Sequence, residues 1–254
     1  MQFVDTHCHI HESALFDVAM VDDALNAATE ADVSKIIGVG TNIKSSIEAV
    51  ELADRIAFCY AIVGVHPHDS KDGVDYIEQI LKKHSKKVVG VGEIGLDYFY
   101  AHSPKPAQYK ALEQQLEWAT EYDLPVSFHV RDAFDDFWSI FANFPGVKGV
   151  LHSFTDNAQN LERGLSEGLY IGLNGISTFT KDETQRQLFD SIPLERILLE
   201  TDAPFLTPPP HRGKVNEPAF VRHVAEYHAK RRGVELEHLA RVTSANASTL
   251  FSLS

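Results

Sequence analysis

Short apolar runs alternate with longer stretches of helical periodicity along the whole chain. Continuous apolar runs of about four to eight residues are typical of buried strands, and apolar positions three and four apart indicate an amphipathic helix. The predicted strands cover residues 3–5, 35–40, 58–65, 88–94, 126–129, 149–152, 170–173 and 197–200. The predicted helices cover residues 17–31, 44–55, 75–84, 106–122, 133–143, 157–167 and 182–190, with two more over 217–232 and 235–251.

This alternation predicts the fold class. Eight strands, each followed by a helix, within 254 residues favour a closed (β/α)8 TIM-type barrel that forms a single domain over residues 1–254. An open doubly wound sheet is the alternative, because alternation alone does not prove closure. The barrel makes the sharper prediction, since its catalytic groups must stand at the carboxyl ends of the strands.

Polar side chains do stand where the apolar runs end. In residues 5–11 (DTHCHIH), His7 and His9 follow the first run two positions apart, so a strand would send both imidazoles to the same side. Imidazole is the commonest nitrogen ligand of divalent metals. Further polar residues end four later runs: Glu93, His129, His152 and Asp202.

These six residues predict a centre for two divalent ions. Paired ions about 3.5–4 Å apart stabilise both the attacking and the leaving oxygen in hydrolytic displacements. Glu93 is the best placed to bridge the ions because a carboxylate offers two oxygens. Asp202 can bind one ion and accept a proton from the attacking water. The alternative for each residue is a structural histidine or a helix cap on a loop.

Composition limits the partners. The formal net charge of −13 and the pI near 5.4 argue against a protein that coats long nucleic acid, which needs an extensive basic face. A nucleic-acid end can still enter a metal site, because bound cations offset the local carboxylates. The 44% hydrophobic and 23% charged residues are typical of a globular protein, and no stable protein partner is expected.

Three features favour a cytoplasmic protein. No window approaches the roughly 18 apolar residues of a membrane span, and the N-terminus reaches His7 too soon for a signal peptide. The two cysteines, Cys8 and Cys59, cannot build a disulfide framework, which favours a reducing compartment.

Several sequence blocks carry a family resemblance over nearly the whole chain. They are DTHCH at 5–9, GVHPH at 64–68, VGEIGLDY at 91–98, LPVSFHVRDA at 124–133, LHSF at 151–154, PLERILLETDAPFLTP at 193–208 and NEP at 216–218. In their order and spacing they resemble the TatD family of metal-dependent deoxyribonucleases, within the amidohydrolase-like barrels. The resemblance is specific for the family and much less so for the substrate.

The resemblance implies the same six ligands. His7 and His9 match the first ligands of one metal, Glu93 the ligand of both metals, and His129 and His152 the ligands of the second. Asp202 matches the acid that activates water, and His66 resembles a substrate-side residue rather than a ligand. Ser153 and Thr155-Asp156 depart from the usual pattern after strand six. Asp156 adds negative charge there, which weakens the case for an anionic substrate.

Three cations are candidates for phosphate contacts. Arg131, Arg212 and Lys214 are expected on loops after strands, where their side chains can meet phosphate oxygens. Solvated surface charge is the alternative for each.

The expected function is therefore a metal-dependent deoxyribonuclease that trims 3′ ends of DNA or cleaves another small phosphodiester or ester substrate. An amide or ester hydrolase, such as a D-aminoacyl-tRNA deacylase, is the alternative, and a non-catalytic metal-bound protein is a third. The ligands suit Zn²⁺ or Mn²⁺, and nuclease activity can also use Mg²⁺.

Overall fold

The computed structural model describes residues 1–83 and 85–253. His84, the last residue of the helix expected at 75–84, therefore lies outside the described residues. The chain divides into two compact units. The first unit combines Met1–Gly38 with Ser153–Ser254, and the second is Val39–His152.

The described residues contain eight strands, which form one sheet in the order β1-β2-β3-β4-β5-β6-β7-β8. They are β1 (Phe3–Cys8), β2 (Val33–Val39), β3 (Cys59–Val63), β4 (Val88–Asp97), β5 (Val126–Arg131), β6 (Gly149–Leu151), β7 (Tyr170–Leu173) and β8 (Ile197–Leu199). The strands are parallel, and helices alternate with them. The predicted (β/α)8 fold is thus confirmed, whereas the single-domain extent stays a prediction.

Helices fill the connections. They are α1 (Val18–Glu30), α2 (Ile43–Arg55), α3 (Asp75–Lys82), α4 (Lys105–Glu121), α5 (Phe134–Phe141), α6 (Ala158–Ser166), α7 (Gly175–Phe179), α8 (Glu183–Ser191), α9 (Val221–Arg232) and α10 (Leu236–Phe251). Short 3-10 turns are η1 (Pro67–Asp72), η2 (Leu194–Arg196) and η3 (Pro218–Phe220). The sequence did not predict α7, because five residues are too few to show helical periodicity.

In the first unit, β1 pairs with β2 and β7 pairs with β8. A parallel bridge between Cys8 and Ala203 brings the end of β1 beside the segment that follows β8. All six residues of β1 are buried. Helix α10 packs against β1 and β8, where Asn246 donates a side-chain hydrogen bond of 2.9 Å to the Ile197 carbonyl. The ends of β1 and β8 are therefore fixed next to each other.

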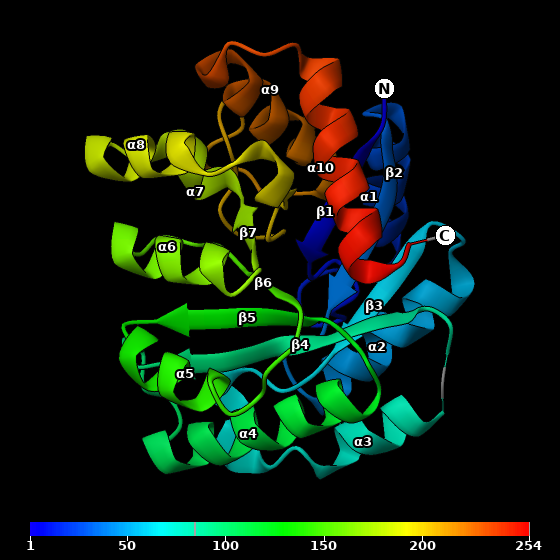
Figure 1. The fold of residues 1–254 in the computed structure, drawn as a ribbon. Helices are drawn as coiled ribbons and strands as arrows, with labels where there is room; N and C mark the ends of the chain where they lie inside the picture. The colour runs from blue at the N-terminus through cyan, green and yellow to red at the C-terminus, as the bar shows by residue number, and fades with distance from the viewer. Residues whose placement is uncertain (84, 254) are drawn as a thin grey trace. The chain divides into compact units, whose positions relative to one another are not determined.

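In the second unit, β3, β4, β5 and β6 pair in sequence order. Helix α2 lies against β3 and α4 against β4 (Figure 1). Helix α2 begins where Asn42 and Ser45 form a reciprocal capping box, which satisfies two amide donors at the helix start. On α5, Phe137 packs edge-to-face on the buried Phe128 of β5, with ring centroids 5.1 Å apart.

The observed strands differ from the predicted ones mainly at their ends. β4 continues to Asp97 and β5 to Arg131, because Ile94 to Asp97 pair residue by residue with Phe128 to Arg131. β8 ends at Leu199 and β6 at Leu151, so Glu200 and His152 follow their strands. Pairing between neighbours sets these bounds, and hydropathy alone does not reveal it.

Two expectations concern membranes and thiols. Among the described residues, no helix combines the length and apolar character needed to cross a membrane. Cys8 and Cys59 are both buried thiols rather than partners in a disulfide. Burial raises the pKa of the Cys59 thiol to about 12, so it is not a nucleophile near neutral pH.

Candidate metal centre

The first unit gathers His7, His9 and Asp202. One ligand atom from each lies within 4.8 Å of the others. The Nε2 atoms of His7 and His9 are 3.3 Å apart, and Oδ1 of Asp202 lies 3.3 Å from Nε2 of His9 and 3.8 Å from Nε2 of His7. Both imidazoles are buried. The two histidines thus share one side of the chain, as their spacing predicted.

The backbone positions this group. The Asp202 amide donates to the His7 carbonyl at 2.8 Å, and the His9 amide donates to the Ala203 carbonyl at 2.7 Å. Asp202 itself has a left-handed conformation with φ of 60°, which aspartate tolerates better than most residues. The carboxyl end of β1 and the segment after β8 therefore present their polar side chains together.

Asp5 supports the same junction from inside the unit. Its carboxyl is fully buried and accepts hydrogen bonds from the Thr201 amide at 2.9 Å and from the Thr201 hydroxyl at 2.6 Å. Burial raises the pKa of Asp5 to about 8, although these hydrogen bonds oppose the rise. The sequence motif placed Asp5 in the family block without predicting this role.

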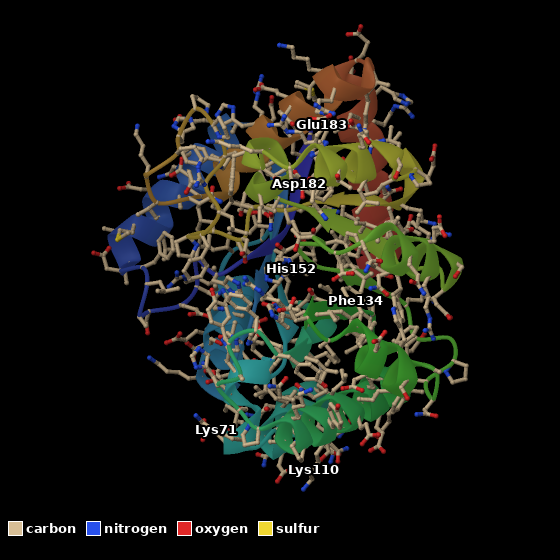
Figure 2. All side chains as sticks on the ribbon, turned by 90° about the vertical axis from the view of Figure 1, so that its left-hand side faces the viewer. Lys71, Lys110, Phe134, His152, Asp182 and Glu183 are labelled. Carbon is tan, nitrogen blue, oxygen red and sulfur yellow. The ribbon has the colours of Figure 1, made fainter. Side chains whose placement is uncertain are left out.

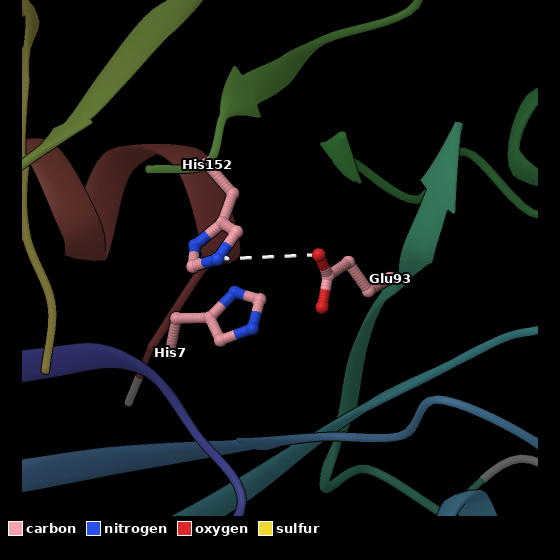
Figure 3. A group of neighbouring side chains, drawn as sticks. All are labelled: His7, Glu93 and His152. Atoms are coloured by element: carbon pink, nitrogen blue, oxygen red, sulfur yellow. Dashed lines mark ion pairs between the residues drawn. The ribbon is translucent and has the colours of Figure 1, made fainter. Parts of the chain in front are cut away.

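The second unit gathers His66, Glu93, His129 and His152 around one carboxylate oxygen. Oε1 of Glu93 lies 2.7 Å from Nδ1 of His129, 3.6 Å from Nε2 of His66 and 3.9 Å from Nε2 of His152. Figure 3 shows the Glu93 carboxylate facing the His152 ring. His152 is buried, whereas the side chains of Lys71 and Lys110 lie at the surface of the unit (Figure 2). The predicted members of this half of the site therefore meet.

A bulge in β4 sets the direction of Glu93. Val91 pairs with Val126 but Ile94 pairs with Phe128, so β4 has one extra residue across Gly92 and Glu93. An extra residue of this kind re-aims a side chain relative to the regular strand. The expectation that Glu93 stands near a strand end is wrong, because β4 continues for four more residues to Asp97.

Gly95 allows β4 and β5 to approach closely beyond the bulge. A Cβ atom at Gly95 would lie 1.8 Å from the His129 carbonyl oxygen, and the residue has a φ of +154°. Any side chain at this position would push the two strands apart. Glycine is thus required beside His129.

Asp97 is the functional residue that the sequence analysis missed. Its Oδ2 lies 2.9 Å from Nε2 of His129 and 3.1 Å from Nε2 of His68, and its Oδ1 accepts from the Tyr100 amide at 2.9 Å. Burial would raise the pKa of Asp97, but these bonds hold it well below its usual range. Asp97 stands four residues after Glu93, and this even spacing on one strand was the available signal.

His129 is therefore held between two carboxylates. Burial alone would lower its pKa, yet Asp97 and Glu93 raise the pKa of His129 to about 9. The two carboxylates also favour binding of a cation beside the His129 ring. A carboxylate behind a histidine is the usual arrangement at metal sites, where it fixes the orientation of the ring.

His66 has a defined proton position. Its Nδ1 accepts a hydrogen bond of 3.1 Å from the His68 amide, so the neutral ring carries its proton on Nε2, the atom that faces Glu93. Burial first, and then neighbouring histidines, lower the pKa of His66 well below its usual value. His66 thus faces Glu93 as a hydrogen-bond donor, and its expected role as a substrate-side residue rather than a ligand stays a prediction.

The predicted phosphate contacts are found on different elements. Arg131 is the last residue of β5, so its expected place on a loop is wrong, and the extended pairing with Asp97 explains the difference. Arg212 and Lys214 lie in one exposed loop, where Arg212 donates to the Thr207 carbonyl at 2.7 Å. The guanidinium of Arg212 also lies 3.7 Å from the centroid of the Phe179 ring. Their role stays a prediction.

The donor atoms in each unit fit a divalent metal ion. Within each of the groups His7–His9–Asp202 and His66–Glu93–His129, the ligand atoms are mutually within 4.8 Å. Buried imidazole nitrogens and carboxylate oxygens are ligands of Zn²⁺ and Mn²⁺, and carboxylates also suit Mg²⁺. Several groups of the chain can therefore bind metal, as the sequence predicted.

Comparison with known proteins identifies the family. The sequence model of the family described as TatD related DNase matches residues 4–252. The chain belongs to this family. It is 38% identical to the uncharacterized metal-dependent hydrolase YcfH of Escherichia coli K12, covering 100% of this chain and 97% of that protein. It is 37% identical to the 3′-5′ ssDNA/RNA exonuclease TatD of Salmonella typhimurium, covering 91% and 93%.

A solved structure of a TatD homologue has the same fold as this chain. The TatD homologue YJJV of Escherichia coli K12 superposes with a TM-score of 0.90 at 31% identity, covering 99% of this chain and 98% of that chain. Family membership confirms the resemblance predicted from the motifs, together with the (β/α)8 fold and the hydrolase class. The individual ligand assignments stay predictions for this TatD protein.

Proposed function

We propose that this member of the TatD family is a metal-dependent exonuclease that removes nucleotides from the 3′ end of single-stranded DNA. The observation that carries the proposal is the convergence of buried and half-buried imidazoles and carboxylates in each unit within a TatD-family chain. A relative named as a 3′-5′ ssDNA/RNA exonuclease, 37% identical over 91% of this chain, supports a nucleic-acid substrate over an amide.

Six residues of the chain are proposed to hold two divalent ions. His7 and His9 would hold one ion with an oxygen from Asp202, His129 and His152 would hold the other, and Glu93 would serve as a ligand of both. When bound, such ions polarise the scissile phosphoryl group and lower the pKa of water.

The residues around the ions have separate tasks. Asp202 accepts the proton of the attacking water through a carboxylate oxygen. His66 donates its Nε2 proton to a substrate oxygen, since the His68 amide fixes the opposite nitrogen as an acceptor. Asp97 keeps the His129 ring in place. Arg131, Arg212 and Lys214 contact phosphates of the strand.

The test compares substrates with the same protein preparation. Metal-stripped protein is supplied in turn with Zn²⁺, Mn²⁺ or Mg²⁺ and given single-stranded DNA labelled at the 5′ end. The proposal expects a ladder that shortens from the 3′ end and releases mononucleotides. RNA of the same sequence and a panel of small esters and D-aminoacyl-tRNA run in parallel.

The alternative function is an amide or ester hydrolase, because paired ions polarise carbonyl and phosphoryl oxygens alike. Turnover of an ester or of D-aminoacyl-tRNA without any cleavage of DNA or RNA would replace the nuclease proposal. Metal binding without turnover of any of these substrates would favour a non-catalytic protein. A reducing cytoplasmic location, without a membrane or a stable protein partner, is part of the proposal.

A further inference from the structure

Two large aromatic side chains stand exposed directly after the network around Asp97. Phe99 is 56% exposed and Tyr100 is 51% exposed. Their rings contact each other edge-to-face with centroids 4.9 Å apart. Single exposed apolar residues are ordinary on protein surfaces, whereas contiguous ones mark binding sites more often.

Arg131 joins these rings into one surface. Its guanidinium carbon lies 4.1 Å from the centroid of the Phe99 ring and 4.9 Å from that of Tyr100. Arg131 reaches this position because it ends β5 and pairs with Asp97 at the end of β4. His102 stacks nearly parallel on Tyr100 at 5.7 Å. We call Phe99, Tyr100 and Arg131 the aromatic platform.

The aromatic platform is connected to the candidate ligands of the second unit. The Tyr100 amide donates to Asp97 at 2.9 Å, and Asp97 contacts Nε2 of His129 at 2.9 Å. The rings of His68 and Tyr100 also contact edge-to-face at 5.5 Å. Asp97 therefore contacts both Tyr100 of the aromatic platform and the candidate ligand His129.

The negative charge of the protein favours base stacking over attraction to the phosphate backbone as the means of binding a nucleic-acid strand. With a net charge of −13, the whole molecule repels a polyanion. Stacking of a base on an aromatic ring does not depend on net charge and accepts every base. The guanidinium of Arg131 adds a local positive charge, which both supports the rings and meets phosphate.

We propose that the aromatic platform stacks an unpaired nucleobase of the single-stranded substrate close to the scissile bond. The inference rests on the proposed nuclease function and adds to it a base-binding subsite on Phe99 and Tyr100. A base within a duplex is already stacked and cannot use such a surface without being unpaired.

The test measures binding of two strands that differ only in their bases. Fluorescence anisotropy is recorded for a labelled single-stranded oligonucleotide and for an abasic strand with the same number of phosphates. Both carry phosphorothioate linkages at the 3′ end so that they survive the titration. The wild type should bind the base-bearing strand about tenfold more tightly, as expected for one stacked base.

The double variant Phe99→Ala/Tyr100→Ala should lose this preference and bind both strands with the affinity that the wild type has for the abasic strand. Tyr76→Ala is the matched control, since Tyr76 is an aromatic residue of the same unit on α3 that is 39% exposed. It should keep the preference. A double variant that still prefers the base-bearing strand, or a wild type without any preference, would overturn the base-binding subsite.

Turnover separates this inference from the proposed function. Wild-type cleavage of plain single-stranded DNA or RNA with no base preference in binding would remove only the subsite. A base preference that depends on Phe99 and Tyr100, found in a protein that cleaves neither DNA nor RNA, would remove only the nuclease proposal.

Discussion

The two groups of candidate ligands are positioned by different means. In the first unit, backbone hydrogen bonds between the end of β1 and the segment after β8 place His7, His9 and Asp202. In the second unit, His129 is positioned through its side chain, by Glu93 on one ring nitrogen and Asp97 on the other. The first group thus depends on strand pairing, and the second depends on a network of charges.

The two groups should therefore differ in how they tolerate substitution of neighbouring side chains. A group fixed by the backbone tolerates changes in the side chains around it, as long as the strands remain paired. A group fixed by side chains is sensitive to the loss of any hydrogen-bond partner. An imidazole that loses its partner can rotate, or its proton can move to the other ring nitrogen. Substitutions in the two groups should therefore differ in how strongly they reduce metal binding and turnover.

Glu93→Ala should have the largest effect. It removes the carboxylate proposed to bind both ions, so metal content and turnover should fall together, with activity near the background rate. Elemental analysis beside a DNA cleavage assay measures both. Glu113→Ala, an exposed glutamate on α4 of the same unit, is the control. A Glu93→Ala protein that retains its metal would show that Glu93 is not a shared ligand.

Asp202→Asn should separate metal binding from catalysis. The amide keeps the shape and one ligand oxygen but cannot accept the proton of water. We expect metal content close to that of the wild type and a kcat lower by about 10²–10⁴-fold, the usual contribution of a positioned base. Asp22→Asn on α1, at an exposed position, should change neither. Near-native kcat with metal bound would exclude Asp202 as the base.

Asp97→Asn and Asp5→Asn compare the two means of positioning directly. Asp97→Asn replaces the carboxylate behind His129 and should weaken metal binding or activity by about 10- to 100-fold. Asp5→Asn should have an effect of less than about threefold, because an amide oxygen still accepts from the Thr201 amide and its NH2 can donate to the Thr201 hydroxyl. Metal affinity and kcat are measured for both variants. Equal losses would contradict the contrast drawn between the units.

Replacement of the three cations should affect KM and not kcat. Replacing Arg131, Arg212 and Lys214 by Ala, singly and together in a triple variant, should raise KM for an oligonucleotide severalfold and leave kcat nearly unchanged, because each change removes one exposed phosphate contact. Lys110→Ala, on the exposed side of α4 (Figure 2), is the control for lost charge. An unchanged KM in the triple variant would show that these residues do not bind phosphate.

The sequence predicted the alternation of strands and helices and the polar residues that stand where the apolar runs end. His7 and His9 were recognisable from their spacing of two, and Asp202 from its place after the last apolar run. The bulge at Gly92–Glu93 and the extension of β4 to Asp97 were not recognisable, because strand register depends on the neighbouring strand. Asp97 and His68 acquire their role only when β4, β5 and η1 bring them together.

The most direct test of the proposed two-ion centre is a metal titration of the stripped wild-type protein during cleavage of end-labelled single-stranded DNA. Manganese is added in increments, and bound metal and the rate of 3′ nucleotide release are followed together. We predict no activity in the stripped protein and a rate that rises until two ions are bound per chain. Cleavage that persists without metal, or a full rate reached at one ion per chain, would contradict the proposed two-ion centre.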